Sequence, residues 1–192
     1  YGVEMVDTLT GFKYIGDVMN RLVEAGEGER FLMGFEESCG YLTGLHVRDK
    51  DAVNAALLVC EMTAHYKKQG RSLCQMLDAL YEEFGSYLTR ADSFAFAGAG
   101  AMERMAAVME RLRGLRVEEL AGSPVTDFRD YRDTGATGLP AADVLSYTLA
   151  DGCNVTVRPS GTEPKLKLYF TVREDSPERC RQRYVRLRQA DI

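Results

Sequence analysis

The sequence predicts an α/β fold in the first half of the chain and an α+β fold in the second half, within 192 residues. In the first half, amphipathic helical patterns alternate with a short apolar strand pattern, which is typical of layered α/β structure. In the second half, several alternating strand patterns lie between short helices, which favours an antiparallel sheet with helices on one face. We place the boundary in the polar stretch 86–92 and assign residues 1–88 and 89–192 to two domains.

The first elements of the chain follow a strand, helix, strand order. Residues 3–6 are expected to form a short strand, and residues 13–25 a helix that ends near Gly26. This helix carries apolar residues on one face, namely Ile15, Val18, Met19 and Leu22. The apolar run 31–35 predicts a short strand that is buried on both faces. Residues 36–50 are expected to be a loop with room for one short strand.

Two helices follow this loop. Residues 51–68 repeat apolar side chains at i, i+4, i+7 and i+11, which predicts a helix with one apolar face, formed by Val53, Leu57, Cys60 and Ala64. This helix stops at Gly70. Ser72 and Gln75 then form a capping-box pattern that starts the next helix. That helix ends at Gly85 and has an apolar face formed by Leu73, Leu77, Leu80 and Phe84.

The second half opens with a strand pattern over 93–96 and a helix pattern over 102–113. The sequence then becomes rich in strand patterns, at residues 125–131, 144–149, 154–158 and 165–172. Ser176 and Pro177 supply an N-cap and a first helical residue for a last helix, whose inward residues are Cys180, Tyr184 and Leu187. These patterns predict an antiparallel sheet of four or five strands with helices on one face.

Composition excludes several classes of protein. The net charge is −5 and the chain has no Trp and one basic island, which argues against a nucleic-acid-binding protein. No apolar run approaches 18 residues and no signal-peptide pattern is present, so we expect no membrane association. The five cysteines have no CxxC spacing. We expect them to be reduced core or near-core thiols of a cytoplasmic protein, without a zinc site, although Cys39 lies in a polar loop.

The loop at residues 158–165, Arg-Pro-Ser-Gly-Thr-Glu-Pro-Lys, is the strongest candidate site. It lies between two strand patterns and brings together the groups that bind a phosphate dianion. Arg158 can pair bidentately with a phosphate, Ser160 and Thr162 can donate hydroxyl hydrogen bonds, and Gly161 lets the backbone N–H approach the anion. Residues 153–173 carry a local excess of positive charge. The alternative is a hairpin with a solvated polar turn.

A second polar loop, at residues 34–41, directly follows the apolar strand pattern. Adjacent carboxylates at Glu36 and Glu37 beside Ser38 mark a position where ligands bind in α/β domains. A carboxylate can accept hydrogen bonds from two neighbouring sugar hydroxyls, and Gly40 permits an unusual backbone angle. The alternative is a helix N-terminus with acidic residues in its first turn.

Basic residues near this second loop are weaker candidates. Lys50 or Arg48, in the charged stretch 46–51, would contact a phosphate or a hydroxyl group, and Lys13 has the same status. The alternative is a solvated loop in which Asp49 or Asp51 caps the following helix, and on the residues alone this alternative is the stronger one.

Residues 34–41, 47–51 and 158–165 together resemble the α-D-phosphohexomutase superfamily. The resemblance is to phosphoglucomutases and phosphomannomutases of the bacterial type related to phosphopentomutase, and it extends from residue 10 to residue 169. It implies a partial α/β domain 3, which carries the sugar-binding loop, and a C-terminal domain 4 with a fold like that of the TATA-binding protein, which carries the phosphate-binding loop.

The resemblance also implies roles for single residues. Glu36 and Ser38 would contact the O3 and O4 hydroxyls of the hexose. The non-transferring phosphate would be held by Arg158, Ser160, Gly161 and Thr162. Lys50 would act near the reacting hydroxyl, in proton transfer or charge stabilisation, and Lys13 would lie on the substrate side. Both loops are therefore expected to turn toward a common cleft.

The resemblance implies an intramolecular phosphotransferase that interconverts hexose 1-phosphate and hexose 6-phosphate through a phosphoserine and a bisphosphate intermediate. It implies Mg²⁺ held by domain 2 and glucose 1,6-bisphosphate as an activator. The sequence contains neither a Ser-His-Asn-Pro motif nor an Asp-x-Asp-x-Asp run, so we expect a C-terminal fragment that lacks domains 1 and 2 and is inactive alone. The alternative is a phosphosugar-binding module without catalysis. Glucose, mannose and pentose phosphates are not distinguished.

Overall fold

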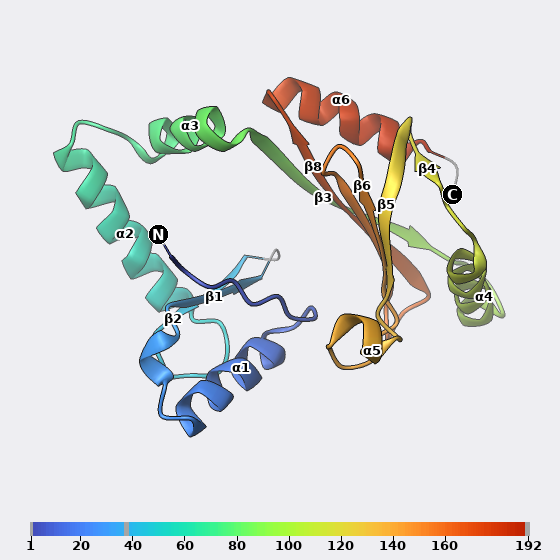
Figure 1. Ribbon diagram of the computed structural model, residues 1–192, viewed down its shortest axis with the longest axis horizontal. Helices are drawn as coiled ribbons and strands as arrows, with labels where there is room; N and C mark the ends of the chain where they lie inside the picture. Colours follow the sequence, from blue (N-terminus) through green and yellow to red (C-terminus); the bar gives the residue numbers. More distant parts are fainter. Residues whose placement is uncertain (1, 37–38, 191–192) are drawn as a thin grey trace. The chain divides into compact units, whose positions relative to one another are not determined.

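A computed structural model describes residues 2–36 and 39–190 of the chain. The chain divides into two compact units, Tyr1–Leu77 and Asp78–Ile192, which are described in turn (Figure 1). No helix within the described part of the chain is both long and apolar enough to cross a membrane.

The first unit is built on a short hairpin and one amphipathic helix. Helix α1 (Phe12–Glu24) leads through a 3₁₀ turn, η1 (Gly28–Arg30), to strands β1 (Met33–Glu36) and β2 (Gly40–Thr43). The strands pair antiparallel, with Gly34 opposite Leu42. A small core between α1 and the hairpin contains Phe12, Met19 and Leu42, with Ile15 and Phe31 packed against it. Because Gly34 has no side chain, Ile15 can pack directly on the strand.

Local capping signals set the next two helices, α2 (Ala52–Lys68) and α3 (Leu73–Phe84). The Asp51 carboxylate accepts hydrogen bonds from the backbone N–H groups of Val53 and Asn54, as expected for an N-cap. The predicted capping box is confirmed, because Ser72 N–H donates to Gln75 Oε1 over 2.8 Å and Gln75 N–H donates to Ser72 Oγ over 3.2 Å.

Two expectations for the first unit are wrong. Residues 3–6 form no strand, and Val3, Met5 and Val6 are exposed. Strand β1 is not buried on both faces, since Met33 and Phe35 are 41% and 54% exposed. The reason is that the hairpin has only two strands, and α1 covers only the face that carries Gly34 and Leu42. The expected short strand within residues 36–50 is present as β2.

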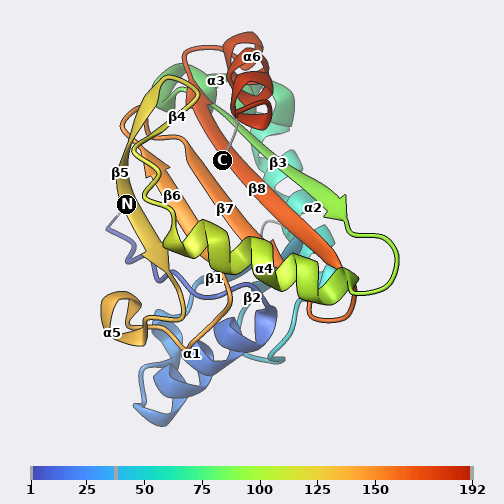
Figure 2. The same ribbon diagram turned by 90° about the vertical axis from the view of Figure 1, so that its right-hand side faces the viewer.

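The second unit is a twisted antiparallel sheet of six strands in the order β3-β8-β7-β6-β5-β4 (Figure 2). The strands are β3 (Ser86–Ala95), β4 (Glu119–Leu120), β5 (Ser123–Asp130), β6 (Leu145–Leu149), β7 (Asn154–Pro159) and β8 (Lys165–Glu174). The first strand therefore pairs with the last one, and the strands between them follow as hairpins.

Helices α4 (Ala101–Gly114) and α6 (Pro177–Arg188) cover one face of this sheet, as predicted (Figure 2). Their apolar sides and the inward side chains of the strands form one core, which includes Met105, Met109, Leu112, Tyr147, Val155, Val157, Phe170, Cys180 and Leu187. A short helix, α5 (Thr134–Thr137), lies between β5 and β6. The opposite face is polar, because alternation along β6 and β7 places Ser146, Asn154 and Thr156 there, joined by side-chain hydrogen bonds.

The structure corrects the prediction in three further places. Strand β3 begins at Ser86 and not at residue 93, so it includes the stretch 86–92, and the sheet has six strands because β4 was not predicted. Cys153 and Cys180 are buried as expected, but Cys60 and Cys74 are exposed and are not core residues of this chain. They lie on α2 and α3, which have no buried residue.

Candidate functional site

Glu36 and Lys50 meet beside the β1–β2 hairpin. Glu36 ends β1 and its side chain is only 11% exposed, whereas the Lys50 side chain is 52% exposed. The Lys50 ammonium Nζ lies 3.5 Å from Glu36 Oε1 and 5.8 Å from the centre of the Phe12 ring. The structure thus brings together two of the residues that the sequence singled out, one from each of two separate motifs.

Gly40 makes this meeting possible, but not for the reason expected from the sequence. Its backbone does not adopt a left-handed conformation, which instead occurs at the preceding residue, Cys39, with φ of 63°. A Cβ atom at Gly40 would lie 2.8 Å from Glu36 Oε1 and 3.0 Å from Lys50 Cδ. Gly40 is therefore required for close approach of two side chains. Ser38, the other expected sugar contact in this loop, lies outside the described residues, as does Glu37.

Lys50 is held as a cation. A hydrogen bond to Asp49, followed by the negative charges of Asp49 and Glu36, raises the pKa of the Lys50 ammonium above its ordinary value. The Nζ–Oδ1 distance to Asp49 is 3.4 Å. Lys50 can therefore donate hydrogen bonds and stabilise negative charge, and it is not prepared to act as a base in this state.

The other basic candidates of the first unit are placed differently. Arg48 donates hydrogen bonds to Asn20 Oδ1 and to the carbonyl oxygens of Leu45 and Val47, so its guanidinium ties the loop to α1. Between Lys50 and Arg48, the geometry favours Lys50 as the ligand contact. Lys13 is exposed on α1, with its Nζ 4.7 Å from the centre of the Tyr14 ring. It forms no ion pair with a described acidic residue. No contact of Lys13 in the structure tests its substrate role, which stays a prediction.

The predicted phosphate loop is the tight connection between β7 and β8. Ser160 N–H donates to the Lys165 carbonyl over 2.8 Å, which closes the loop, and Lys165 N–H donates to the Glu163 carbonyl over 2.7 Å. Thr162 N–H lies 3.5 Å from Ser160 Oγ. A Cβ atom at Gly161 would meet nothing within 4 Å, so the space beside its backbone is open. The loop therefore has hydroxyl and backbone donors around an accessible glycine.

Arg158 faces a second cation across the hairpin. Arg158 and Lys167 are directly opposite in the register of β7 and β8, on the polar face of the sheet. Like charges in this position repel each other. Within residues 2–36 and 39–190, neither side chain forms an ion pair, whereas the adjacent Lys165 pairs with Glu163 at 2.8 Å. This arrangement would be stabilised by a bound anion.

Lys167 is a candidate contact that we did not single out from the sequence. A signal was present, because Lys167 contributes to the basic island at residues 153–173 and lies one strand period after Lys165. What the sequence alone does not give is the cross-strand partner, which depends on the register of the hairpin.

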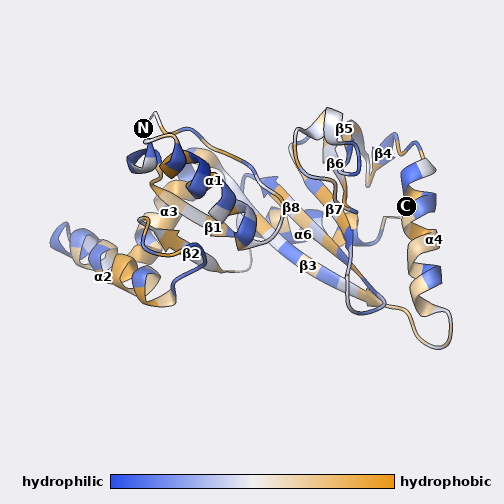
Figure 3. Cartoon of the chain, turned by 90° about the horizontal axis from the view of Figure 1, so that it is seen from below, coloured by the Kyte–Doolittle hydropathy of each residue, from blue (hydrophilic) through white to orange (hydrophobic). Residues whose placement is uncertain are grey.

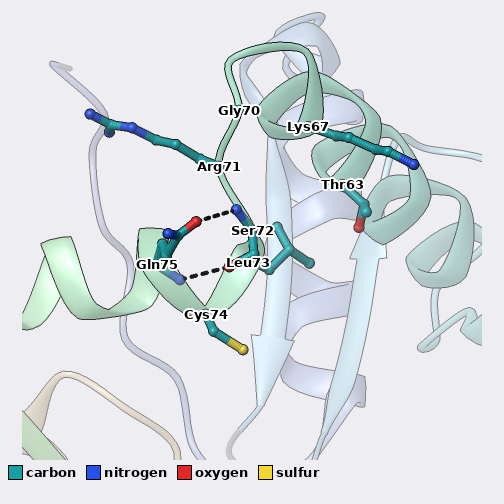
Figure 4. A pocket seen from close by; sticks show the side chains of 8 residues that line it. All are labelled: Thr63, Lys67, Gly70, Arg71, Ser72, Leu73, Cys74 and Gln75. Carbon is teal, nitrogen blue, oxygen red and sulfur yellow. Dashed lines mark hydrogen bonds between the residues drawn. The ribbon is translucent and has the colours of Figure 1, made fainter.

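A hollow of about 550 Å³ lies at the turn between α2 and α3, and none of the candidate residues lines it (Figure 4). Its lining residues are Thr63, Lys67, Gly70, Arg71, Ser72, Leu73, Cys74 and Gln75. The polar groups of Ser72 and Gln75 satisfy each other in the capping box. The basic side chains of Lys67 and Arg71 extend in different directions in Figure 4. No polar groups converge in this hollow, and we do not assign a ligand to it.

The described residues also offer no place for a metal ion. No group of three or more His, Cys, Asp or Glu side chains in this part of the chain is arranged to hold one. The Mg²⁺ implied by the sequence resemblance therefore does not fit the side chains that the structure describes.

Two family models match the chain. Residues 1–84 match the phosphoglucomutase/phosphomannomutase α/β/α domain III, and residues 112–183 match the phosphoglucomutase/phosphomannomutase C-terminal domain. A probable phosphomannomutase of Haemophilus influenzae is 35% identical over 179 residues, which cover 93% of this chain and 33% of the relative. A phosphoglucomutase of Staphylococcus haemolyticus is 33% identical over 190 residues, which cover 94% and 34%.

Other relatives extend the comparison. A human glucose 1,6-bisphosphate synthase is 31% identical over 183 residues, which cover 88% of this chain and 29% of the relative. The chain thus spans about a third of the length of the curated relatives it matches. Among solved structures, the open form of the exocytosis-sensitive phosphoprotein parafusin, a phosphoglucomutase from Paramecium, has a TM-score of 0.60 at 21% identity. That match covers 88% of this chain and 29% of the other, and it supports the fold alone.

The two domain models are consecutive parts of one family and together account for most of the chain. The predicted resemblance and fold class are therefore confirmed. By its two matched domains and its relatives, the chain belongs to the phosphoglucomutase/phosphomannomutase family.

Proposed function

We propose that this chain is the C-terminal part of a phosphohexomutase that interconverts hexose 1-phosphate and hexose 6-phosphate, with phosphoglucomutase as the first candidate activity. The observation that carries the proposal is the pair of Arg158 and Lys167, two facing cations without described acidic partners at the start of a loop rich in hydrogen-bond donors. A phosphate dianion would neutralise this pair and accept hydrogen bonds from Ser160, Thr162 and the Gly161 backbone. The five cysteines are free, which fits a cytoplasmic enzyme.

In the proposed site, Glu36 accepts hydrogen bonds from neighbouring hydroxyls of the sugar. Its carboxylate is nearly buried but borders the half-exposed Lys50, so an incoming hydroxyl can reach it from one side. Ser38 would add a donor and an acceptor, and Lys13 would lie at the edge of the same site. In this proposal Glu36 contacts hydroxyls of the phosphosugar, and Arg158 contacts its non-reacting phosphate.

Lys50 is the proposed catalytic residue of this chain. Its ammonium is a cation at neutral pH, and contacts with Asp49 and Glu36 raise its pKa further, so it would stabilise the charge that develops on the oxygen of the reacting hydroxyl. Proton transfer through Lys50 would require that substrate binding first weaken its contacts with Asp49 and Glu36.

The remaining chemistry is assigned to the preceding part of a longer protein. A phosphoserine there would transfer its phosphoryl group to one sugar hydroxyl, which gives a bisphosphate and a free serine. The bisphosphate would then turn around and return its other phosphoryl group to the serine. Mg²⁺, which the described residues do not fit, would be held by that preceding part and would neutralise phosphate charge. Glucose 1,6-bisphosphate is the proposed activator, because it can phosphorylate the serine.

The test compares the longer protein with the 192-residue chain on glucose 1-phosphate, mannose 1-phosphate and ribose 1-phosphate, with Mg²⁺ and a hexose bisphosphate. We expect turnover of a hexose phosphate by the longer protein and none by the 192-residue chain, which contains no phosphorylation motif of the family type. Binding of sugar phosphates without turnover by the longer protein would support the alternative, a binding module. Turnover by the 192-residue chain alone would contradict the assignment of the phosphoserine and Mg²⁺ to the preceding part of a longer protein.

A further inference from the structure

Lys50 lies in a stretch of chain without regular secondary structure. Residues 44–51 connect β2 to α2 and contain neither helix nor strand. Loops of this kind move more than the elements they connect, whereas a group that stabilises charge in a reaction must be placed accurately. The loop therefore needs anchors on both sides of Lys50. On one side, Arg48 Nε donates to Asn20 Oδ1 of α1 over 2.6 Å, and an added Cβ at Gly16 of α1 would lie only 3.0 Å from the Arg48 carbonyl oxygen.

Asp51 is the anchor on the other side of Lys50. Its backbone N–H donates to the Tyr41 carbonyl oxygen of β2 over 2.9 Å. Its carboxylate Oδ1 accepts hydrogen bonds from the N–H groups of Val53 and Asn54 at the start of α2, over 2.9 and 3.0 Å. The other carboxylate oxygen, Oδ2, lies 3.0 Å from Nε2 of His46. The two oxygens therefore have different partners, one in α2 and one in the loop itself.

The contact between His46 and Asp51 closes the loop around Lys50. Because an ionised carboxylate only accepts hydrogen bonds, His46 Nε2 carries the hydrogen and donates it. This hydrogen bond, followed by those from the α2 backbone, holds the pKa of the Asp51 carboxyl below its ordinary value, so the acceptor stays ionised. The side chains of His46 and Asp51 are 51% and 26% exposed, and exposed pairs add little to folding stability. We therefore expect the contact to affect the geometry of the loop more than the free energy of unfolding.

We infer that His46 is a positioning residue, which acts through Asp51 to hold the Lys50 ammonium beside Glu36. Arg48 fixes the loop against α1, and His46 fixes the orientation of the Asp51 carboxylate directly after Lys50. With both anchors in place, the Lys50 ammonium keeps its distance of 3.5 Å from Glu36 Oε1. The inference rests on the proposed catalytic role of Lys50 and assigns to His46 no contact with the substrate.

Two uncharged replacements of His46 in the full-length protein provide the test. The amide nitrogen of Gln reaches about as far as Nε2 and can donate to Asp51, whereas that of Asn reaches only about as far as Nδ1. Because the groups that bind the substrate are unchanged, we expect His46→Asn to lower kcat for the hexose phosphate roughly tenfold with KM within about twofold. His46→Gln should keep kcat within about threefold of the parent.

The matched control is His65→Asn, which should not change kcat. His65 is the other histidine of the chain, and its Nε2 lies 2.8 Å from Gln69 Nε2. It belongs to the last turn of α2, where the helix is hydrophilic (Figure 3). A loss of kcat in this control would point to a general effect of histidine replacement.

A double-mutant cycle separates a role through Lys50 from a general effect on the fold. In a Lys50→Met background, His46→Asn should change the remaining kcat by less than about twofold, because no ammonium is left to position. A role in folding alone would reduce kcat in both backgrounds. A further tenfold loss in the Lys50→Met background would therefore overturn the inference.

A labelling measurement reports on Lys50 without turnover. Acylating reagents react with neutral amines, and the contacts with Asp49 and Glu36 raise the pKa of the Lys50 ammonium, so these contacts slow its acylation. We expect Lys50 to be acylated at least about threefold faster in His46→Asn than in the parent or in His46→Gln. Mass spectrometry measures these rates relative to the exposed Lys68 in the same sample.

Two further outcomes would overturn the inference. One is equal acylation of Lys50 in the parent, His46→Asn and His46→Gln, and the other is an equal kcat for the two His46 variants. An inactive parent would instead contradict the proposed activity. The acylation rates would still show whether His46 positions Lys50, so the two failures are distinct.

Discussion

The Lys50 ammonium lies 3.5 Å from the Glu36 carboxylate, in a space that exists because residue 40 is glycine. Glu36 is nearly buried at the end of β1, and Lys50 precedes the N-cap of α2, so two elements hold the pair in place. The pair is therefore arranged before any ligand binds, which reduces the ordering cost of binding. Three of the following predictions test this pair and the phosphate loop in the full-length protein, and two test the fold of the second unit.

Glu36→Gln should weaken recognition of the sugar more than recognition of phosphate. The amide keeps the shape of the side chain but loses charge-assisted acceptance of hydroxyl hydrogen bonds, worth about 1.5–3 kcal/mol. We expect kcat/KM for the hexose phosphate to fall by roughly 10–100-fold while the inhibition constant of inorganic phosphate stays within about twofold. An equal loss for both ligands would mean that Glu36 is not a hydroxyl contact.

Gly40→Ala should disturb the Glu36–Lys50 pair through its volume alone. The added methyl would lie 2.9 Å from Glu36 Cγ, so one of the two side chains must move. We expect a loss of about 1–3 kcal/mol of unfolding free energy, together with a fall in kcat/KM. Gly114→Ala is the control, because an added methyl there meets nothing within 4 Å, and it should not destabilise. Unchanged stability of Gly40→Ala would show that the loop adapts without cost.

Arg158→Ala should reduce phosphosugar affinity by about 2–4 kcal/mol, measured by calorimetry. The same variant should not be less stable without ligand, because it removes repulsion with Lys167 across the hairpin. Arg129→Ala is the matched control, since Arg129 lies on β5 of the same sheet and already pairs with Asp127 at 2.7 Å. A fall in affinity of equal size for both variants would point to a general charge effect and against a phosphate site at Arg158.

Asp151→Asn should destabilise the second unit by about 3 kcal/mol, because it leaves the Arg183 guanidinium unpaired. Arg183 is 4% exposed, its Nη2 lies 2.6 Å from Asp151 Oδ2, and its Nε has no described partner. The urea midpoint measures this loss. Asp175→Asn is the control and should cost at most about 1 kcal/mol, since its ion pair with Arg179 is exposed.

The Asp151 pair also predicts a pH dependence. Burial alone would raise the pKa of Asp151, but hydrogen bonds from Cys153 and the Arg183 charge hold the pKa below its ordinary value. The Asp151 carboxyl therefore binds a proton less tightly in the folded state than in the unfolded chain. The ionised Asp151 therefore stabilises the folded state at pH values above its pKa in the unfolded chain, which is about 4. This stabilisation is lost as the pH falls through the lower pKa of Asp151 in the folded state. The Asp151→Asn variant should lack this part of the acid-induced loss, and an unchanged difference between the proteins from pH 7 to pH 2 would contradict the assignment.

Elements with local signals were predictable from the sequence. Helix α2 begins one residue after its predicted start because the Asp51 cap is a local feature, and α6 follows the Ser176–Pro177 signal in the same way. Strand β3 was mostly missed, because Arg90 and Asp92 interrupt its apolar pattern and its partner β8 lies far along the chain. The apolar pattern of α2 also did not reveal that Val53 and Leu57 are exposed, since burial depends on elements outside the helix.

The candidate site was predictable as residue types and not as contacts. The sequence pointed to Glu36, Lys50 and Arg158, but the distance between Glu36 and Lys50 depends on how β1 and the start of α2 pack. Gly40 was expected to supply a backbone angle and instead supplies space, a distinction that needs coordinates. Lys167 can be identified as a candidate phosphate contact only from the register of β7 and β8, which places it opposite Arg158.

The pairing of β3 with β8 has a consequence for synthesis on the ribosome. Ser86 lies opposite Glu174, so β3 leaves the ribosome long before its partner is translated. At about 5–20 residues per second, β3 waits on the order of 10 s with Leu88 and Phe94 unpaired. Nascent chains of this protein should therefore bind hydrophobic-surface chaperones until β8 emerges, and a stall between β7 and β8 would release a sheet that lacks one edge.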